Sequence, residues 1–194
     1  MISGRTLVLA STSPGRRALV DRLRVPYEVL APEVDEDGLV GPDPATTSVR
    51  RAIAKALDVA ARRPEAHVLG ADQVVDLDGE VLGKPGSKER AHAQLARLAG
   101  RTHRLVTSLA LVAPGGTPEV RSEVAHLTMR ALDAGEIGRY VDLDAPEGCA
   151  GSYRIEGLGI SLFERVEAAD WTGIVGLPLL TTAAMLRRAG WDLP

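Results

Sequence analysis

The sequence predicts a mixed α/β fold, in which a twisted sheet is flanked by helices. Strand-like and helix-like segments interleave along the whole chain, which is typical of such folds. The composition, 45% hydrophobic and 25% charged, is that of an ordinary globular protein. With 194 residues, no internal repeat and no clear linker, the chain is long enough for a core of its own, so we expect a single domain over residues 1–194.

The N-terminal region reads as strand, helix and strand. An apolar run at 6–10 is typical of a buried strand, and Ser13 with Pro14 forms the start signal of a helix, as N-cap and first helical residue. A second strand is expected at 27–32. The stretch 33–44, rich in acids, glycine and proline, is expected to be a loop.

A long helix is expected from about residue 47 to 63. Its apolar residues recur at helical spacing, which predicts that they face the core. Lys55 lies away from that stripe, so the pattern alone favours a solvated side chain for it. The predicted stripe consists of Val49, Ile53, Ala56, Leu57 and Ala60.

The middle of the chain contains a strong hairpin signal. A third strand is expected at 67–71, and residues 73–82 alternate around the Asp78-Gly79 pair, which favours a tight turn. A helix at 87–99 follows, with Ala91, Leu95 and Leu98 on one side. The remaining predicted elements are strands at 103–114 and 119–132 joined by the turn 114–117, a helix at 133–143, strands at 153–157 and 159–168, and a helix at 177–188.

Composition excludes several functional classes. The net charge of −3 gives no basic excess for nucleic acid, and 3% aromatic residues leave little for base stacking. No apolar run is long enough for a membrane span or a signal peptide. Cys149 is the single cysteine, which excludes an intrachain disulfide and a cysteine-rich zinc site, so a reducing cytoplasm and a small buried thiol are expected. The four histidines lack metal spacing and are expected at surface or edge positions: His67, His92, His103 and His126.

The stretch ASTSPGRR, 10–17, could bind an anion. A helix start leaves backbone N–H groups free and carries partial positive charge, and Arg16 and Arg17 add full charges in the first turn. The first turn of a helix ordinarily favours acids, so these two arginines are informative. A plain N-cap with two solvated arginines is an equally good interpretation of this stretch alone.

Two further candidates lie at neighbouring turns in GADQVVDLDGEVLGKP, 70–85. Asp72 is expected at the carboxyl end of a strand, where ligands bind in open α/β sheets, and could coordinate a metal or act as a general base. Lys84 precedes a proline, which restrains its backbone, and would act as a point charge on phosphates. Taken alone, Asp72 is more often a turn-former. The arrangement matches neither the Walker loop nor the dinucleotide-binding glycine pattern.

The acidic loop 33–37 is a candidate for Mg²⁺, which takes one or two carboxylates together with water and phosphate oxygens. By itself, a solvated acidic loop is the favoured interpretation. Cations, acids and a helix-start anion site together are the groups that phosphoryl chemistry needs.

In the order and spacing of its motifs, the sequence resembles the Maf family of nucleoside triphosphate pyrophosphatases. The resemblance covers nearly the whole chain. It implies an α/β fold of the inosine-triphosphatase type with two lobes around a deep cleft, usually a homodimer, and a divalent cation such as Mg²⁺, Mn²⁺ or Co²⁺. It also implies hydrolysis of a nucleoside triphosphate to a monophosphate and diphosphate. The matching strings are LASTSPGRRALVDRL, APEVDED, AIAKA, LGADQVV, GEVLGKP, LAGRTHRLVTSLALV, CAGSYRIEGLGISLFERVE and VGLPLL.

The resemblance also assigns roles to residues. Asp72 matches the family's proton acceptor, which activates water for attack on the α-phosphorus. Glu36 matches a cleft acid that would help Asp72 to hold the metal. The matches to substrate-binding positions are Ser11, Arg16, Lys55 and Lys84.

Three positions, Gly15, Gln73 and Glu156, match those that tune base preference in the family. Gln73 and Glu156 resemble the 7-methyl-GTP branch, whereas the dTTP/UTP branch tends to have Thr and Gln at the last two of these positions. A carboxylate at Glu156 can accept hydrogen bonds from a guanine N1–H and amino group. Gly15 departs from the branch, which has a tryptophan there, and glycine offers no ring to stack on the base. A Maf enzyme of other base preference and a non-enzymatic cell-division regulator are the alternatives.

Overall fold

The computed structural model describes residues 5–194 and has the predicted mixed α/β fold. Its seven strands within this range form one sheet in the order β2-β1-β3-β5-β6-β7, and β4 pairs with β3. None of the helices in residues 5–194 is long and apolar enough to cross a membrane. The strands are β1 (Leu7–Ala10), β2 (Tyr27–Val29), β3 (His67–Leu77), β4 (Glu80–Leu82), β5 (Thr102–Val112), β6 (Glu119–Met129) and β7 (Phe163–Glu167), and the α-helices are α1 (Pro14–Asp21), α2 (Pro44–Arg62), α3 (Lys88–Leu98), α4 (Ala134–Asp144) and α5 (Leu179–Arg188).

The chain divides into two compact units, and its path passes between them within β3, β5 and β6. Each unit is described by itself below, and the expected single domain over 1–194 stays a prediction. The first unit comprises Met1–Asp72, Thr107–Glu123 and Asp170–Pro194, and the second comprises Gln73–Val106 and Val124–Ala169.

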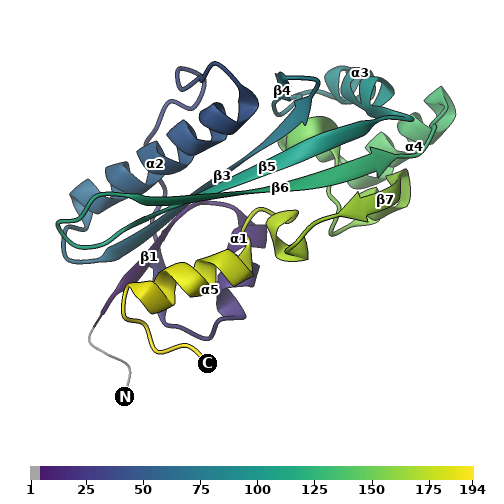
Figure 1. Cartoon of the computed structure of the whole chain (residues 1–194). Coiled ribbons are helices and arrows are strands. Elements are labelled where there is room, and N and C mark those ends of the chain that lie inside the picture. The colour runs from purple at the N-terminus through teal and green to yellow at the C-terminus, as the bar shows by residue number, and fades with distance from the viewer. Residues whose placement is uncertain (1–4) are drawn as a thin grey trace. The chain divides into compact units, whose positions relative to one another are not determined.

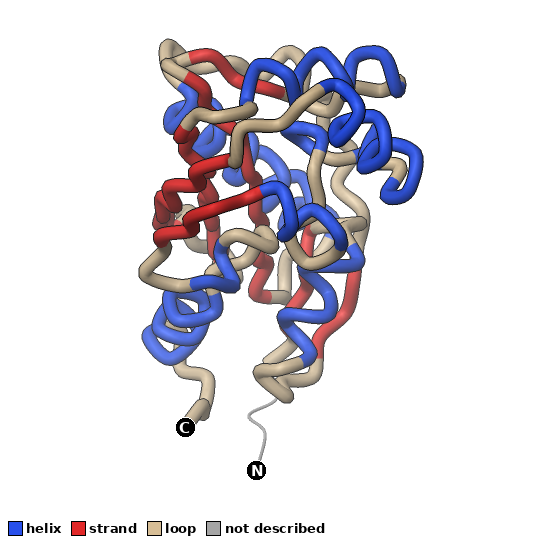
Figure 2. Tube along the Cα trace, turned by 90° about the vertical axis from the view of Figure 1, so that its right-hand side faces the viewer, coloured by secondary structure: helices blue, strands red, loops and turns tan. Residues whose placement is uncertain are grey.

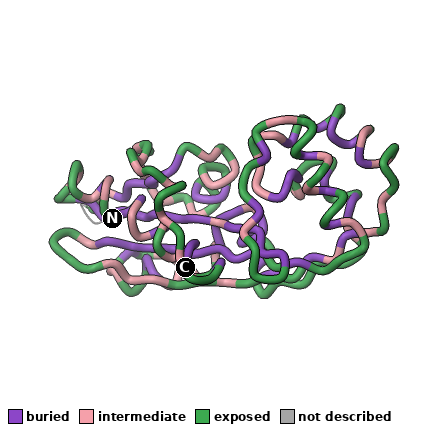
Figure 3. Tube along the Cα trace, turned by 90° about the horizontal axis from the view of Figure 1, so that it is seen from above, coloured by how far each residue is buried: buried purple, intermediate pink, exposed green. Residues whose placement is uncertain are grey.

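In the first unit, helices cover both faces of the strands. Leu7 and Leu9 of β1 pack with residues of α1 and α5, whereas Val8 and Ala10 pack with residues of α2. This alternation follows from the two-residue period of a strand. Figure 1 shows α2 on one side of β1 and β3, with α1 and α5 on the other. All four residues of β1 are buried, because helices cover the strand from both sides, and Figure 3 shows how buried and exposed positions are distributed along the chain.

Helix α2 differs from its prediction in start and in orientation. It begins at Pro44, three residues before the expected start, because the Asp43 carboxylate accepts a hydrogen bond from the Thr46 N–H at 2.8 Å. The predicted apolar stripe is correct for Ala56, Ile53 and Ala60, which belong to or pack against the core cluster, and wrong for Leu57, which is 43% exposed. Ala52 and Val59, which the prediction left out, join Ala56 in the cluster that packs against β1 and β3.

Helix α5 is capped by a preceding segment. Its N-cap position is Pro178, which offers no side-chain hydrogen bond. The Leu180 N–H donates to Asp170 Oδ2 at 2.7 Å, and the Leu179 N–H donates to Thr172 Oγ1 at 2.8 Å. Asp170 and Thr172 are both buried, so the start of α5 at Leu179, two residues later than expected, is set by tertiary contacts.

In the second unit, the turn of the β3–β4 hairpin and the buried face of α3 are as the sequence predicts. The hairpin between β3 and β4 turns at Asp78 and Gly79, both with positive φ, as the Asp-Gly pair predicts. The expected break between a third strand and this hairpin is absent, because β3 runs unbroken over His67–Leu77. Helix α3 buries Ala91, Leu95 and Leu98 as predicted and packs against α4, and Figure 2 shows these helices side by side.

The predicted strand at 153–157 is wrong, and that at 159–168 is correct only from Phe163 onward. Residues 155–157 form a turn, closed by a hydrogen bond from the Gly157 N–H to the Arg154 carbonyl at 3.2 Å. A Cβ at Gly159 would lie 2.3 Å from that same carbonyl oxygen, so the chain folds tightly back on itself here. Such a close return is incompatible with an extended strand.

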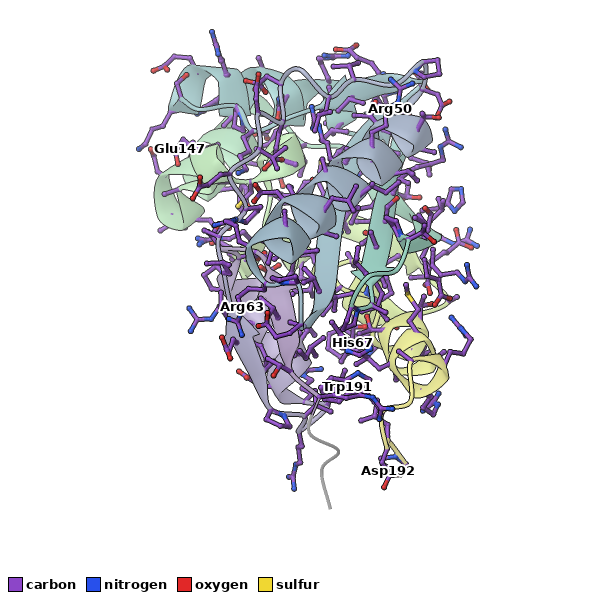
Figure 4. The ribbon with its side chains drawn as sticks, turned by 90° about the vertical axis from the view of Figure 1, so that its left-hand side faces the viewer. Arg50, Arg63, His67, Glu147, Trp191 and Asp192 are labelled. Carbon is purple, nitrogen blue, oxygen red and sulfur yellow. The ribbon has the colours of Figure 1, made fainter. Side chains whose placement is uncertain are left out.

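Two histidines are buried, contrary to the expected surface or edge positions. His67 lies beside Trp191 (Figure 4). The ring centroids of the two residues are 6.0 Å apart and the rings are nearly perpendicular. His103 is 2% exposed, and its Nε2 lies 2.9 Å from the Tyr153 hydroxyl. His92 is half-buried and His126 is exposed.

Burial lowers the pKa of His103 to about 4. Because the unfolded imidazole titrates near 6.5, the full contribution to stability is present above about pH 6.5 and is lost as the pH falls toward 4. We expect the free energy of unfolding to fall by about 3 kcal/mol over that interval through this group. Urea unfolding of wild type and His103→Gln across pH 4–7 would measure it, with the exposed His126→Gln as control. Parallel pH curves for wild type and His103→Gln would contradict the assignment.

Candidate functional site

Asp72 lies within β3, not at the carboxyl end of its strand as predicted. The parallel pairing of β3 with β1 ends at the Ala10–Gly70 pair, so Asp72 lies two residues beyond it, past the end of β1. This is the place on a parallel pair where ligand-binding side chains gather. Its side chain is 5% exposed.

Lys55 joins Asp72 to Glu36. Its Nζ lies 2.7 Å from Asp72 Oδ1 and 2.9 Å from Glu36 Oε2. The side chain of Lys55 is 7% exposed, so the solvated lysine expected from the helix pattern is wrong. Glu36, at 43% exposed, comes from the acidic loop, and these three residues form what we call the carboxylate–lysine cluster.

The second oxygen of Asp72 has no partner. Asp72 Oδ2 is buried and makes no hydrogen bond within residues 5–194. Burial raises the pKa of Asp72 above its usual range, while Lys55 and, more weakly, Arg16 lower it. A buried carboxylate with one oxygen held by lysine and the other unpaired is suited to accept a proton or to bind a cation.

The start of α1 contributes Ser11 and Arg16. Ser13 caps the helix as predicted, since its hydroxyl accepts the Arg16 N–H at 3.4 Å, and its own N–H donates to Ser11 Oγ at 3.1 Å. The Arg16 Nε donates to the Gly176 carbonyl at 2.9 Å, which fixes the guanidinium. Burial lowers the pKa of Arg16, and the charges of Asp72 and Glu36 raise it, so this cation belongs to the electrostatic surroundings of the cluster.

Ser48 is a residue that the sequence analysis missed. It is fully buried on α2, and its hydroxyl donates to the Asp72 main-chain carbonyl at 3.2 Å. The spacing of Ser48, Ala52, Lys55 and Val59 marks the buried face of α2. Helical spacing would have identified Ser48 if small and polar residues had been counted, together with the large apolar ones, as members of the buried face.

Of the three residues expected to tune base preference, Gly15 lies in the first unit. It is the second residue of α1 and is half-buried, and a Cβ there would lie 3.3 Å from Val175 Cγ1. A large side chain at this position would therefore displace its neighbour.

The remaining predicted site residues lie in the second unit. Gln73 follows Asp72 on β3 and is half-buried, whereas Lys84 and Glu156 are exposed. Both Lys84 and Glu156 act on the charge state of Cys149: burial raises the pKa of this thiol, the lysine lowers it and the glutamate raises it. Cys149 itself is half-buried, less than the predicted buried thiol.

The carboxylate–lysine cluster offers two oxygen ligands for a metal, Glu36 and Asp72. In residues 5–194 there is no group of three or more His, Cys, Asp or Glu side chains arranged to hold an ion. Mg²⁺ needs only one or two carboxylates when substrate phosphates and water supply the rest. The unpaired Asp72 Oδ2 is a donor of the right type, so the residues present fit such an ion.

Comparison with known proteins finds close relatives over nearly the whole chain. A protein from Xanthomonas axonopodis pv. citri named 7-methyl-GTP pyrophosphatase is 46% identical over 188 residues, 97% of this chain and 98% of its own. One from Cupriavidus metallidurans with the same name is 44% identical over 186 residues, 95% and 94% of the two chains.

A crystal structure described as a nucleoside-triphosphatase and dITP/XTP pyrophosphatase, from Mycobacterium abscessus, matches with a TM-score of 0.51 at 17% identity. The match covers 94% of this chain and 93% of that one, and at this identity it shows a shared fold alone. The model of the family described as Maf-like protein matches residues 6–189. With the relatives at 44% and 46% identity, this match shows that the chain belongs to the Maf family.

Proposed function

We propose that this protein hydrolyses nucleoside triphosphates to a nucleoside monophosphate and diphosphate, with 7-methyl-GTP as its preferred substrate. The observation that carries the proposal is the buried Asp72, held by Lys55 through one oxygen and unpaired at the other. The names of the relatives support the choice of reaction and substrate.

In the proposed reaction, Asp72 Oδ2 accepts a proton from a water molecule as the water oxygen attacks the α-phosphorus. The bond from the α-phosphorus to the α–β bridging oxygen breaks, and diphosphate leaves. Lys55 holds Asp72 in place through its other oxygen, at 2.7 Å. A base of raised pKa accepts the proton more readily at neutral pH than an ordinary carboxylate does.

Cations supply the remaining electrostatics. Ser11 and Arg16 at the start of α1 are proposed to bind phosphate oxygens, because backbone N–H groups and a guanidinium favour anions there. Lys84, from the second unit, is proposed as a further substrate-binding cation on the ground of the resemblance. A divalent ion such as Mg²⁺, Mn²⁺ or Co²⁺, held by Glu36 and Asp72, would neutralise charge on the phosphates.

Release of diphosphate from a panel of nucleotides would test this proposal. The panel contains 7-methyl-GTP, GTP, dTTP, UTP, CTP and ATP, each with Mg²⁺, Mn²⁺ or Co²⁺ and with EDTA as the metal-free control. We expect hydrolysis, with 7-methyl-GTP turned over fastest. Fastest turnover of dTTP or UTP would favour a Maf enzyme of other base preference. No release from any nucleotide would overturn the catalytic proposal and leave the non-enzymatic cell-division regulator.

Glu156→Gln should change base preference without abolishing hydrolysis. The carboxylate accepts hydrogen bonds from a guanine edge and favours the cationic methylated base, whereas the amide has one acceptor oxygen and no charge. We expect kcat/KM for 7-methyl-GTP to fall by about 10-fold, the equivalent of about 1.4 kcal/mol, with smaller changes for the pyrimidine nucleotides. The exposed Glu164→Gln on β7 serves as control. An unchanged ranking of nucleotides in Glu156→Gln would count against a role of Glu156 in base preference. Gln73 and Gly15 are proposed to influence base preference as well, on the ground of the resemblance.

We further propose a cytoplasmic homodimer that binds no nucleic acid. The resemblance supports the dimer, and the net charge of −3 supports the absence of a nucleic-acid partner. Sedimentation equilibrium would give the mass in solution, and a monomer at all concentrations would contradict the dimer.

A further inference from the structure

We propose that Gly70 is a positioning residue for the carboxylate–lysine cluster: its missing side chain lets α2 pack close enough to β3 for Lys55 to reach Asp72. The inference rests on the function proposed for Asp72, and it concerns how the fold sets the geometry of that pair.

The contact is closer than any side chain permits. A Cβ added at Gly70 would lie 2.6 Å from the Ala52 carbonyl oxygen, 2.8 Å from the Ala56 N and 2.9 Å from the Ala56 Cβ. Two of these atoms are helix backbone, so the clash cannot be relieved by turning a side chain. Gly70 does not have positive φ, and the position therefore requires glycine for space.

The contact lies directly beside the catalytic pair. Ala56 follows Lys55 directly on α2. On β3, Gly70 precedes Asp72 by two residues, so these two positions lie on the same face of the strand. From α2, the Lys55 side chain extends to Asp72, and its Nζ lies 2.7 Å from Asp72 Oδ1. Any outward movement of α2 therefore moves the ammonium group away from the carboxylate.

Ser48 forms a second link between the same two elements. Its hydroxyl donates to the Asp72 carbonyl at 3.2 Å, two turns before Lys55 on α2. Helix α2 is thus joined to β3 at the main chain of Asp72 by Ser48 and at its side chain by Lys55. The close packing at Gly70 makes both contacts possible at once.

Gly70→Ala tests the proposal by kinetics and by NMR. The added methyl group should move α2 outward and lower kcat by about 10- to 100-fold, the effect expected of a displacement on the order of 1 Å, while KM stays within about threefold. The chain has only three lysines, Lys55, Lys84 and Lys88, so ¹⁵N-lysine labelling gives three ammonium groups to assign. We expect a slowly exchanging ammonium signal from the buried Lys55 in wild type and its loss in Gly70→Ala.

Val68→Ala is the matched control. Val68 lies on the same strand and face and packs in the same apolar cluster as α2, but this change removes atoms instead of adding them. It should lower stability while keeping the Lys55 signal and a near wild-type kcat. If Gly70→Ala does not fold, the double variant Gly70→Ala/Ala56→Gly removes one of the three close contacts and keeps the two with helix backbone. Loss of the Lys55 signal is expected there too.

The outcomes separate this inference from the proposed function. A folded Gly70→Ala or double variant that keeps both the Lys55 signal and kcat overturns the role of Gly70. Wild type without any nucleotide hydrolysis overturns the proposed function, and the NMR comparison still decides whether Gly70 sets the Lys55–Asp72 contact.

Discussion

Asp72→Asn should lower kcat for nucleotide hydrolysis by about 10²–10⁴-fold, while nucleotide binding stays within about tenfold of wild type. The amide oxygen can still accept from Lys55, but the group cannot take a proton from water at neutral pH. Steady-state diphosphate release and titration calorimetry with a non-hydrolysable nucleotide would measure the two quantities. Full turnover in the variant would remove Asp72 as the base.

The free energy of unfolding of Asp72→Asn shows whether the fall in kcat comes from lost chemistry or from lost folding. Burial raises the pKa of Asp72, so its charge at neutral pH costs stability, and the neutral amide avoids that cost. The lost charge on Asp72 leaves Lys55 with Glu36 alone at 2.9 Å, which opposes this gain, so we expect the free energy of unfolding of Asp72→Asn at pH 7 to stay within about 2 kcal/mol of wild type. Asp76→Asn is the control, because Asp76 is also buried on β3 and paired with a cation, Arg104, but does not belong to the carboxylate–lysine cluster. It should lose stability without a comparable loss of turnover per folded molecule.

Lys55→Met should lower the free energy of unfolding at pH 7 by about 3–5 kcal/mol, because removing one partner of a buried ion pair leaves the other charge uncompensated. Without Lys55, Arg16 still lowers the pKa of Asp72 and Glu36 still raises it. The pKa of Asp72 rises further, so the variant's deficit should grow as the pH rises from about 4 toward neutrality, where the buried group must ionise. Urea unfolding at pH 5 and pH 7 measures this trend.

Two variants control for the loss of a lysine. Lys88 pairs with Asp142 through side chains that are 51% and 70% exposed, so Lys88→Met should change stability by less than about 1 kcal/mol. The double variant Lys55→Met/Asp72→Asn should recover much of the lost stability, because no buried carboxylate is left without its partner. Equal losses in Lys55→Met and Lys88→Met, or no recovery in the double variant, would mean that the buried pair is not the cause.

Local signals in the sequence predicted the elements whose boundaries depend on neighbouring residues. The Ser13 cap of α1, the turn at Asp78-Gly79 and the buried face of α3 each follow from a few consecutive side chains. The resemblance to a family supplied the roles proposed for Asp72 and Lys55, which no spacing in this single sequence could give.

Contacts between distant segments explain what the sequence alone did not predict. On the buried face of α2 the small Ala52 and Ala56 fit against Gly70, so a pattern based on hydrophobicity missed Ala52, included an exposed leucine and placed Lys55 in solvent. Residues 153–157 look like a strand by composition, yet Arg154 is held by ion pairing with Asp144 and by the Tyr140 hydroxyl, which accepts its N–H at 3.0 Å. Neither set of partners can be identified from local pattern.

Because Asp170 and Thr172 cap α5 from an earlier segment, the formation of this helix depends on that segment. A helix of this length is marginal in water. The first N–H groups of α5 have no side-chain acceptor until Asp170 and Thr172 are in position. Residues 179–188 therefore depend on these two contacts for a capped helix start. These residues become helical together with the turn that precedes them, which couples α5 to the cooperative completion of the first unit.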